Sequence, residues 1–142
     1  MAKIWEGLAV LGMLAAAPSL ANAATVVAHV DVAKQVMTVS RQGKVLYTWK
    51  VSTARKGYDT PLGTWRPYRI HQLWKSRKYD DAPMPYAVFY DRGWAVHGTK
   101  AVSRLGRPAS HGCVRLATSN AKAFYDLVRE VGPGNTRIIV AN

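Results

Sequence analysis

Cysteine and acidic residues are both scarce in this sequence of 142 residues. Eight Asp and Glu residues stand against 20 Lys and Arg residues, so the formal net charge is +12 at pH 7. The single cysteine, Cys113, excludes an intramolecular disulfide and a zinc site built from several cysteines. No apolar run approaches the roughly 20 residues that a membrane-spanning helix requires. These absences argue against a disulfide-stapled fold and against an integral membrane protein.

The length and the apolar content predict one folded domain. Hydrophobic residues make up 49% of the chain and charged residues 20%. That apolar content is too high for a disordered polycation, so we expect a buried core. The length leaves no room for a second catalytic unit.

Residues 1–23 have the pattern of an export signal. Lys3 supplies a positive start, residues 7–17 form an eleven-residue apolar run, and Pro18 interrupts it. Residues 21–23 then read Ala-Asn-Ala, a small-x-small cleavage pattern. The alternative is a buried N-terminal helix, but such a helix would be apolar on every side and would have no polar face for solvent. We therefore expect residues 1–23 to be a signal peptide and residues 24–142 to form the exported domain.

The excess of positive charge predicts acidic partners. An exported protein has no steady contact with nucleic acid, so we expect no nucleic-acid partner. Outside the inner membrane the acidic polymers are anionic polysaccharides and the carboxylates of wall peptides, and a basic surface would concentrate both. Charge that serves solubility alone remains the alternative.

The distribution of β-branched and aromatic residues predicts a β-rich chain. Residues 71–85, which include prolines 83 and 85, predict a long loop or flap. The first three strands are expected to form an antiparallel meander. The expected strands are residues 26–31, 36–40, 45–52, 64–70, 86–90, 94–97 and 136–140.

One helix is predicted near the end of the chain. Apolar positions 123, 124, 127, 128 and 131 recur at spacings of three and four. Thr118 or Ser119 is the expected N-terminal cap, and Gly132 with Pro133 should end the helix. The fold class is therefore mainly β with one C-terminal helix, as in a sandwich or a curled sheet.

Cys113 lies in a segment that is atypical of a buried thiol. Residues 110–116 read Ser-His-Gly-Cys-Val-Arg-Leu, so His111 and Arg115 each lie two residues from the sulfur. Nearby positive charge lowers a thiol pKa from about 8.5 and favours the nucleophilic thiolate. Gly112 permits a tight turn that can aim the N–H groups of residues 111–113 into one oxyanion hole. We expect an activated nucleophile; a small buried hydrophobe is the alternative.

His97 is the candidate base for this thiol. It ends the expected strand 94–97, precedes Gly98, and can reach Cys113 only through the fold. A structural, hydrogen-bonded histidine is the default alternative. A metal site of His97, His111 and Cys113 is a third possibility, but residues 98–120 contain no Asp or Glu to support it. We expect neither a metal nor a cofactor.

Four segments of the chain match one signature in order. They are His97-Gly98 followed by a loop, residues 110–115, residues 51–53 with 60–63 (Thr-Pro-Leu-Gly), and residues 84–86 (Met-Pro-Tyr). A four-residue motif alone would be weak, whereas four ordered segments are specific. From about residue 26 to residue 140, the chain resembles the catalytic domain of L,D-transpeptidases, also called the YkuD domain.

The resemblance implies a β-sandwich of mixed sheets and a two-step acyl transfer on peptidoglycan, in the periplasm or cell wall. Cys113 would attack the diaminopimelate carbonyl of a tetrapeptide stem, release D-alanine and pass the acyl group to an amine acceptor. By matching position, His97 is the general base and the Gly98 carbonyl orients its ring. Ser110, His111 and Gly112 match the positions that shape the nucleophile and the oxyanion hole.

Substrate contacts are expected from the same segments. The loop between His97 and Cys113 contains Lys100 and two arginines and no acidic residue. A guanidinium can bind a carboxylate through two hydrogen bonds, which suits the carboxylates of stem peptides. Arg115 stands where many family members carry Asn. The expected substrate-binding residues are Ser110, Arg115, Arg107, Arg104 and Tyr86.

Two rival functions remain open at this stage. Attack of water on the same thioester would give a carboxypeptidase or a cross-link amidase, and the sequence does not separate these from transfer. A basic wall-binding module without catalysis is the rival from another class. The presence of both His97 and Cys113 argues against it.

Overall fold

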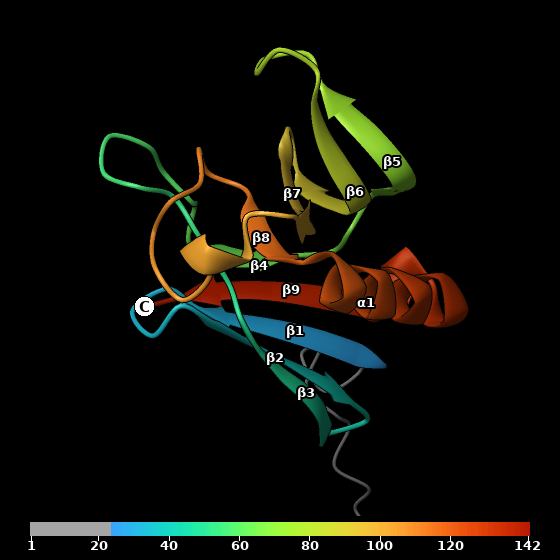
Figure 1. Cartoon of the computed structure of the whole chain (residues 1–142). Coiled ribbons are helices and arrows are strands. Elements are labelled where there is room, and N and C mark those ends of the chain that lie inside the picture. The colour runs from blue at the N-terminus through green and yellow to red at the C-terminus, as the bar shows by residue number, and fades with distance from the viewer. Residues whose placement is uncertain (1–23) are drawn as a thin grey trace, which may run out of the picture.

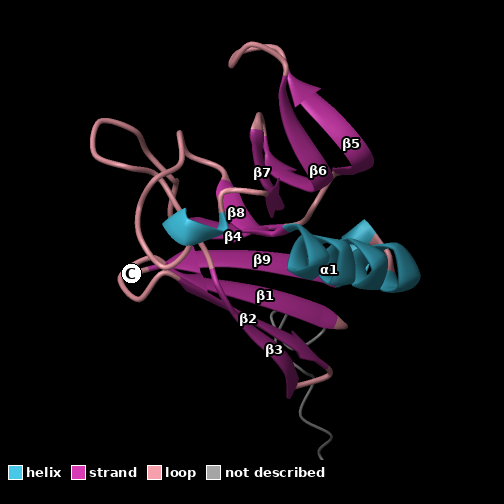
Figure 2. Ribbon diagram, in the orientation of Figure 1, coloured by secondary structure: helices cyan, strands magenta, loops and turns pink. Residues whose placement is uncertain are grey.

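Two sheets and one helix enclose the core of this protein in the computed structural model, which describes residues 24–142 (Figures 1 and 2). The expected signal peptide lies outside the described residues. The first sheet has the order β3-β2-β1-β9-β4 and the second the order β5-β6-β7-β8. The strands are β1 Val26–Asp31, β2 Val36–Arg41, β3 Lys44–Lys50, β4 Gly63–Trp65, β5 Arg69–Ser76, β6 Ala82–Asp91, β7 Trp94–Thr99, β8 Val114–Ala117 and β9 Thr136–Ala141, and the helix is α1 Thr118–Val131.

Alternating apolar residues place the core between the two sheets. In β1, Val26, Ala28 and Val30 are fully buried, while the residues between them are not. Each inward side chain meets counterparts from the second sheet and from α1, such as Phe124 and Val128. The period of two in the sequence therefore gives each strand one buried face. The predicted mainly β fold with one C-terminal helix is confirmed.

The antiparallel meander of β1, β2 and β3 is also confirmed. The sequence did not indicate that the last strand, β9, pairs in parallel with β1 at the centre of the first sheet. The single strand predicted for residues 64–70 is wrong. Its residues divide between β4 in the first sheet and β5 in the second. Pro67, which has no N–H to donate, lies in the connection between them.

The long loop predicted for residues 71–85 is wrong as well. These residues belong to the hairpin of β5 and β6, which stands apart from the first sheet in Figure 1. Proline is tolerated here because β6 pairs with β7 only from Val88 to Asp91. Pro83 and Pro85 pair with β5 alone. Their missing N–H groups therefore cost no hydrogen bond to β7.

Helix α1 packs one apolar face against the core and ends as predicted. Gly132 has a φ of +91° and its N–H donates to the carbonyl of Val128. The predicted cap is wrong, because Ala117 holds the N-cap position and no side chain caps the helix. Thr118 instead donates its hydroxyl to the carbonyl of Thr99. Within residues 24–142, no helix is long and apolar enough to cross a membrane.

Candidate active site

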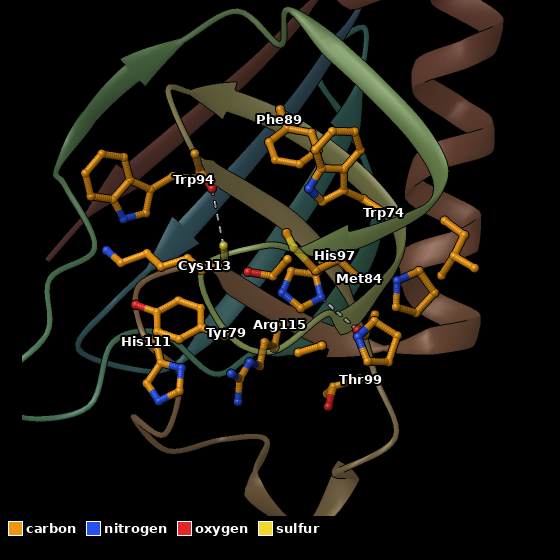
Figure 3. A pocket seen from close by; sticks show the side chains of 18 of the residues that line it. Trp74, Tyr79, Met84, Phe89, Trp94, His97, Thr99, His111, Cys113 and Arg115 are labelled. Atoms are coloured by element: carbon orange, nitrogen blue, oxygen red, sulfur yellow. Dashed lines mark hydrogen bonds between the residues drawn. The ribbon is translucent and has the colours of Figure 1, made fainter.

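The parallel pair of β7 and β8 brings the two predicted catalytic residues to one place. His97 pairs with Arg115 in this ladder, and Cys113 directly precedes β8. Side chains on a strand alternate between faces, so residues 113 and 115 lie on the same side as His97. Figure 3 shows Cys113 and His97 at the floor of one cleft.

Ser110 fixes the turn that carries Cys113. Its hydroxyl donates to the Cys113 carbonyl at 2.6 Å and accepts the Gly112 N–H at 3.0 Å. Thr60 donates to the Gly112 carbonyl at 2.7 Å, tying the turn to the 54–60 loop. Ser110 is fully buried and does not line the cleft. The structure therefore places Ser110 away from the cleft in which a substrate contact was expected, enclosed by the backbone that it holds.

Gly112 occupies a position that no other residue fits. Its φ is +136°, and an added Cβ would lie 2.8 Å from both the Asp59 carbonyl and the Trp94 ring nitrogen. The Gly112 N–H already donates to Ser110, so it is not available to a substrate oxygen. In this structure the expected oxyanion hole therefore reduces to the N–H groups of His111 and Cys113.

His97 is buried and held in one orientation. Its Nδ1 lies 2.8 Å from the Gly98 carbonyl, so Nδ1–H donates there and Nε2 is left as the basic nitrogen (Figure 3). Burial lowers the pKa of His97 to about 4, and the charge of Arg115 acts in the same direction. The imidazole is therefore neutral at pH 7 and able to accept a proton.

The Cys113 thiol lies against an apolar cluster. Met84, Phe89 and Ala95 form this cluster, and the thiol is 3.8 Å from the Gly93 carbonyl. Burial raises the pKa of Cys113 above its ordinary value, against the smaller opposing effects of the Ala95 N–H and of Arg115. Burial therefore opposes the thiolate that the neighbouring positive charges were expected to favour. The resting pair is a neutral thiol and a neutral imidazole, and the proton must move as the sulfur attacks.

A cleft of about 1160 Å³ opens above these residues. One wall consists of β7, the turn at Cys113 and β8, and the other is the β5–β6 hairpin. Sequence reasoning missed the hairpin wall, since it treated residues 71–85 as a loop. The apolar and aromatic character of that segment was the available signal. The missed residues include Trp74, Tyr79, Met84 and Phe89 of the hairpin and Trp94 of β7 (Figure 3).

Three of the expected substrate contacts lie elsewhere. Tyr86 packs against Tyr125 of α1, with ring centroids 5.5 Å apart. Arg104 and Arg107 are exposed on the loop after β7, and neither lines the cleft. Arg104 and Arg107 were expected because they lie between His97 and Cys113 in the sequence. The loop turns outward, so nearness in sequence does not place them near the cleft. Arg115 does line the cleft, together with Lys100.

His111 joins the two walls of the cleft. Its ring stacks on Tyr79 of the hairpin turn at 4.3 Å and lies 4.7 Å from the ring of Tyr58. Burial lowers the pKa of His111, and the nearby cations Arg55 and Arg115 add to the effect. His111 is therefore a neutral aromatic contact at neutral pH. Within residues 24–142, no three His, Cys, Asp or Glu side chains are grouped to hold a metal.

Known proteins share this fold and part of this sequence. A probable L,D-transpeptidase of Escherichia coli K12, YbiS, is 41% identical over 59 residues, which is 41% of this chain and 18% of the relative. An L,D-transpeptidase from Mycobacterium smegmatis is 28% identical with a TM-score of 0.75, covering 84% of this chain and 59% of that one. L,D-transpeptidase 3 of Mycobacterium tuberculosis, solved with a faropenem-derived adduct, is 22% identical with a TM-score of 0.71, over 84% and 61% of the two chains.

These matches cover less than two thirds of each relative's length. The family model of the L,D-transpeptidase catalytic domain, in contrast, matches residues 25–140, nearly everything that the structure describes. The chain therefore belongs to the L,D-transpeptidase catalytic domain (YkuD) family, as the four sequence segments predicted.

Proposed function

We propose that this protein is an exported cysteine L,D-transpeptidase that remodels or cross-links peptidoglycan. The observation that carries the proposal is the placement of Cys113 and His97 on one cleft floor, with Nδ1 of His97 engaged by Gly98. Nε2 is then the free basic nitrogen of this ring. Membership of the family supplies the substrate class, the stem peptide of the wall.

The reaction proceeds in two balanced steps. As the Cys113 sulfur attacks the diaminopimelate carbonyl, His97 takes the thiol proton, and the N–H groups of Cys113 and His111 stabilise the oxyanion. The C–N bond then breaks, and His97 returns the proton to the nitrogen of D-alanine. An amine acceptor next attacks the thioester, gives its proton to His97, and leaves with the acyl group while the thiol is restored. No cofactor enters this sequence.

A neutral pair suits this sequence of proton transfers. The raised pKa of Cys113 and the lowered pKa of His97 both disfavour an ion pair before substrate binds. A bound carbonyl completes the site, and proton transfer then accompanies attack.

The test is to identify the acyl-enzyme and the products. The purified protein is incubated with a tetrapeptide stem and an amine, and mass spectrometry follows the protein and the released D-alanine. The wild type should gain the tripeptide acyl mass, whereas Cys113→Ala should gain none and His97→Gln should be slowed by orders of magnitude. Faropenem should likewise modify the wild type and not Cys113→Ala. Turnover by Cys113→Ala at the wild-type rate would refute the mechanism, and a free tripeptide as sole product would establish hydrolysis instead.

Export is tested separately. We expect the protein isolated from its native envelope to begin at Ala24, because the small-x-small pattern ends at Ala23. Intact-mass measurement reports the first residue directly. A mass that includes Met1 would contradict removal of the signal.

A further inference from the structure

The Arg115 guanidinium is an unpaired positive charge in the wall of the cleft. It is partly buried, and within residues 24–142 neither an acidic side chain nor a hydrogen-bond acceptor pairs with it. Arg104 and Arg55 repel this charge, and the Cys113 sulfur attracts it when the thiol is ionised. A partly buried guanidinium is normally paired with an anion. The Arg115 guanidinium has no such partner in the protein, so it is suited to bind an anionic group of the ligand.

The position of Arg115 relative to His97 indicates which anionic group it meets. The two residues are direct partners in the parallel ladder of β7 and β8, where neighbouring strands lie about 4.8 Å apart. Both side chains line the same cleft. The charge of Arg115 also acts on the pKa of His97, so a ligand group beside His97 lies in the field of this guanidinium.

The proposed reaction places the leaving residue in that space. His97 must give a proton to the scissile nitrogen, so the leaving residue lies beside His97 when the C–N bond breaks. The carboxylate of a terminal D-amino acid is attached to the carbon next to this nitrogen, about 4 Å from the scissile carbonyl carbon. Among the anionic groups of the stem, this carboxylate lies nearest to the scissile bond.

We propose that Arg115 binds the carboxylate adjacent to the scissile nitrogen and thereby selects stems that end in a free D-amino acid. Lys100, three residues after His97 and also on the cleft, adds a longer-range attraction. This inference rests on the proposed function. It adds that the terminal carboxylate of the stem peptide is bound by the Arg115 side chain.

The same subsite constrains the acceptor. The amine that resolves the thioester must approach the position that the leaving nitrogen vacated, since His97 serves both nitrogens. An acceptor with a carboxylate on the carbon next to its amine then makes the same contact with Arg115. D-Alanine should therefore be a better acceptor than D-alaninamide, although the two amines differ only at the carboxyl group.

The experiment compares a tetrapeptide stem that ends in D-alanine with one that ends in D-alaninamide. The ratio of their kcat/KM values for acylation is measured for the wild type, Arg115→Ala and Arg115→Lys. A shared effect of Arg115 on the Cys113 and His97 pKa values cancels in this ratio. We expect the wild type to prefer the acid by roughly ten- to hundredfold, Arg115→Ala to lose this preference, and Arg115→Lys to keep part of it.

Arg104→Ala and Arg107→Ala are the matched controls, since each removes one positive charge near the cleft but from a side chain that does not line it. They should leave the acid-to-amide ratio unchanged at high salt. Exchange of labelled D-alanine or D-alaninamide into the acyl-enzyme tests the acceptor side with the same variants. Thermal denaturation checks folding, and the backbone bonds of Arg115 to Ser52 do not involve the substituted side chain.

The outcomes separate the inference from the proposed function. If the wild type acylates acid and amide equally, or if Arg115→Ala retains the preference, the carboxylate assignment is overturned while the transpeptidase proposal stands. If the control variants lose the preference as Arg115→Ala does, the effect is general attraction and the assignment is again overturned. If Cys113 accepts neither peptide, the proposed function itself fails.

Discussion

The two walls of the cleft are built in different ways. The wall that carries Cys113 is tied through the backbone to the segment that follows β3. Ser52 and Arg115 exchange bonds of 3.0 and 2.9 Å there, and the Ser110 N–H donates to the Thr53 carbonyl. The hairpin wall pairs with β7 only from Val88 to Asp91. Beyond that ladder, the hairpin turn reaches the first wall through the stack of Tyr79 on His111.

This difference separates the chemistry from substrate fit. Proton transfer and acyl transfer tolerate little displacement, and a shift of about 1 Å can reduce a rate about a hundredfold. Nucleophile and base are accordingly placed on strands and a bonded turn. The hairpin contributes aromatic surface, which adapts to a ligand at low energetic cost. We expect substitutions in the first wall to reduce kcat and those in the second to raise KM.

The largest effect is expected from Gly112→Ala in the wall that carries Cys113. The added methyl group meets the Asp59 carbonyl and the Trp94 ring at a φ that disfavours side chains. Strain and overpacking together should lower the free energy of unfolding by about 2 to 6 kcal/mol and reduce kcat at least about a hundredfold. Urea denaturation and acylation kinetics measure both. Gly134→Ala is the control, because its Cβ would meet nothing within 4 Å; equal losses in the two variants would contradict the account.

A second effect concerns the pH dependence of stability. His97 has a folded-state pKa of about 4 and an ordinary unfolded value of about 6.5, so between these values the unfolded chain binds the extra proton. The free energy of unfolding should therefore fall as the pH drops from about 6.5 to about 4, by about 3 kcal/mol in total.

Denaturation of the wild type and of His97→Gln across this range tests the point. The variant should lose most of this pH dependence, whereas His111→Gln should lose less of it because His111 is more exposed. If the two variants follow the same pH profile, burial of His97 is not the cause of the pH dependence of stability.

A smaller effect is expected at the hairpin wall. Tyr79→Ala removes a stacked contact with His111 at 4.3 Å, worth about 1 kcal/mol. The contact between the hairpin turn and the first wall should be weakened to that extent, so KM for the stem should rise about fivefold with little change in kcat. Tyr79→Phe keeps the stack and should behave as the wild type. A fall in kcat without a change in KM would place Tyr79 in the chemistry and break the division between the walls.

The smallest effect is expected in the resting thiol itself. Because burial raises the pKa of Cys113, alkylation by iodoacetamide at pH 7 should be slower than that of a free cysteine. The rate should continue to rise above the pH at which a free thiol is fully ionised. Stopped-time mass spectrometry across pH gives the profile. A rate that is already maximal at pH 7 would show a preformed thiolate, contrary to the neutral pair.

The sequence predicted the elements whose pattern is local. The alternation of Val26, Ala28 and Val30 determined one strand face, and Gly132 with Pro133 determined the end of the helix. The hairpin at residues 71–85 was not predicted, because proline argues against a central strand. Proline is tolerated here because this part of β6 pairs with a neighbouring strand on one side only. Which side a strand leaves unpaired is a property of the sheet and not of the segment.

For the site, the sequence alone predicted the proposed nucleophile, its proposed base and the glycine between Cys113 and His111, because those residue types and spacings are dictated by the chemistry. The tertiary structure decided which cations reach the cleft. Arg104, Arg107 and Arg115 look equivalent along the chain, yet only Arg115 of the three lines the cleft, beside His97. The structure also adds an effect on the pKa of the thiol that the sequence does not display. Burial, which depends on the whole fold, outweighs the neighbouring positive charges that the sequence displays.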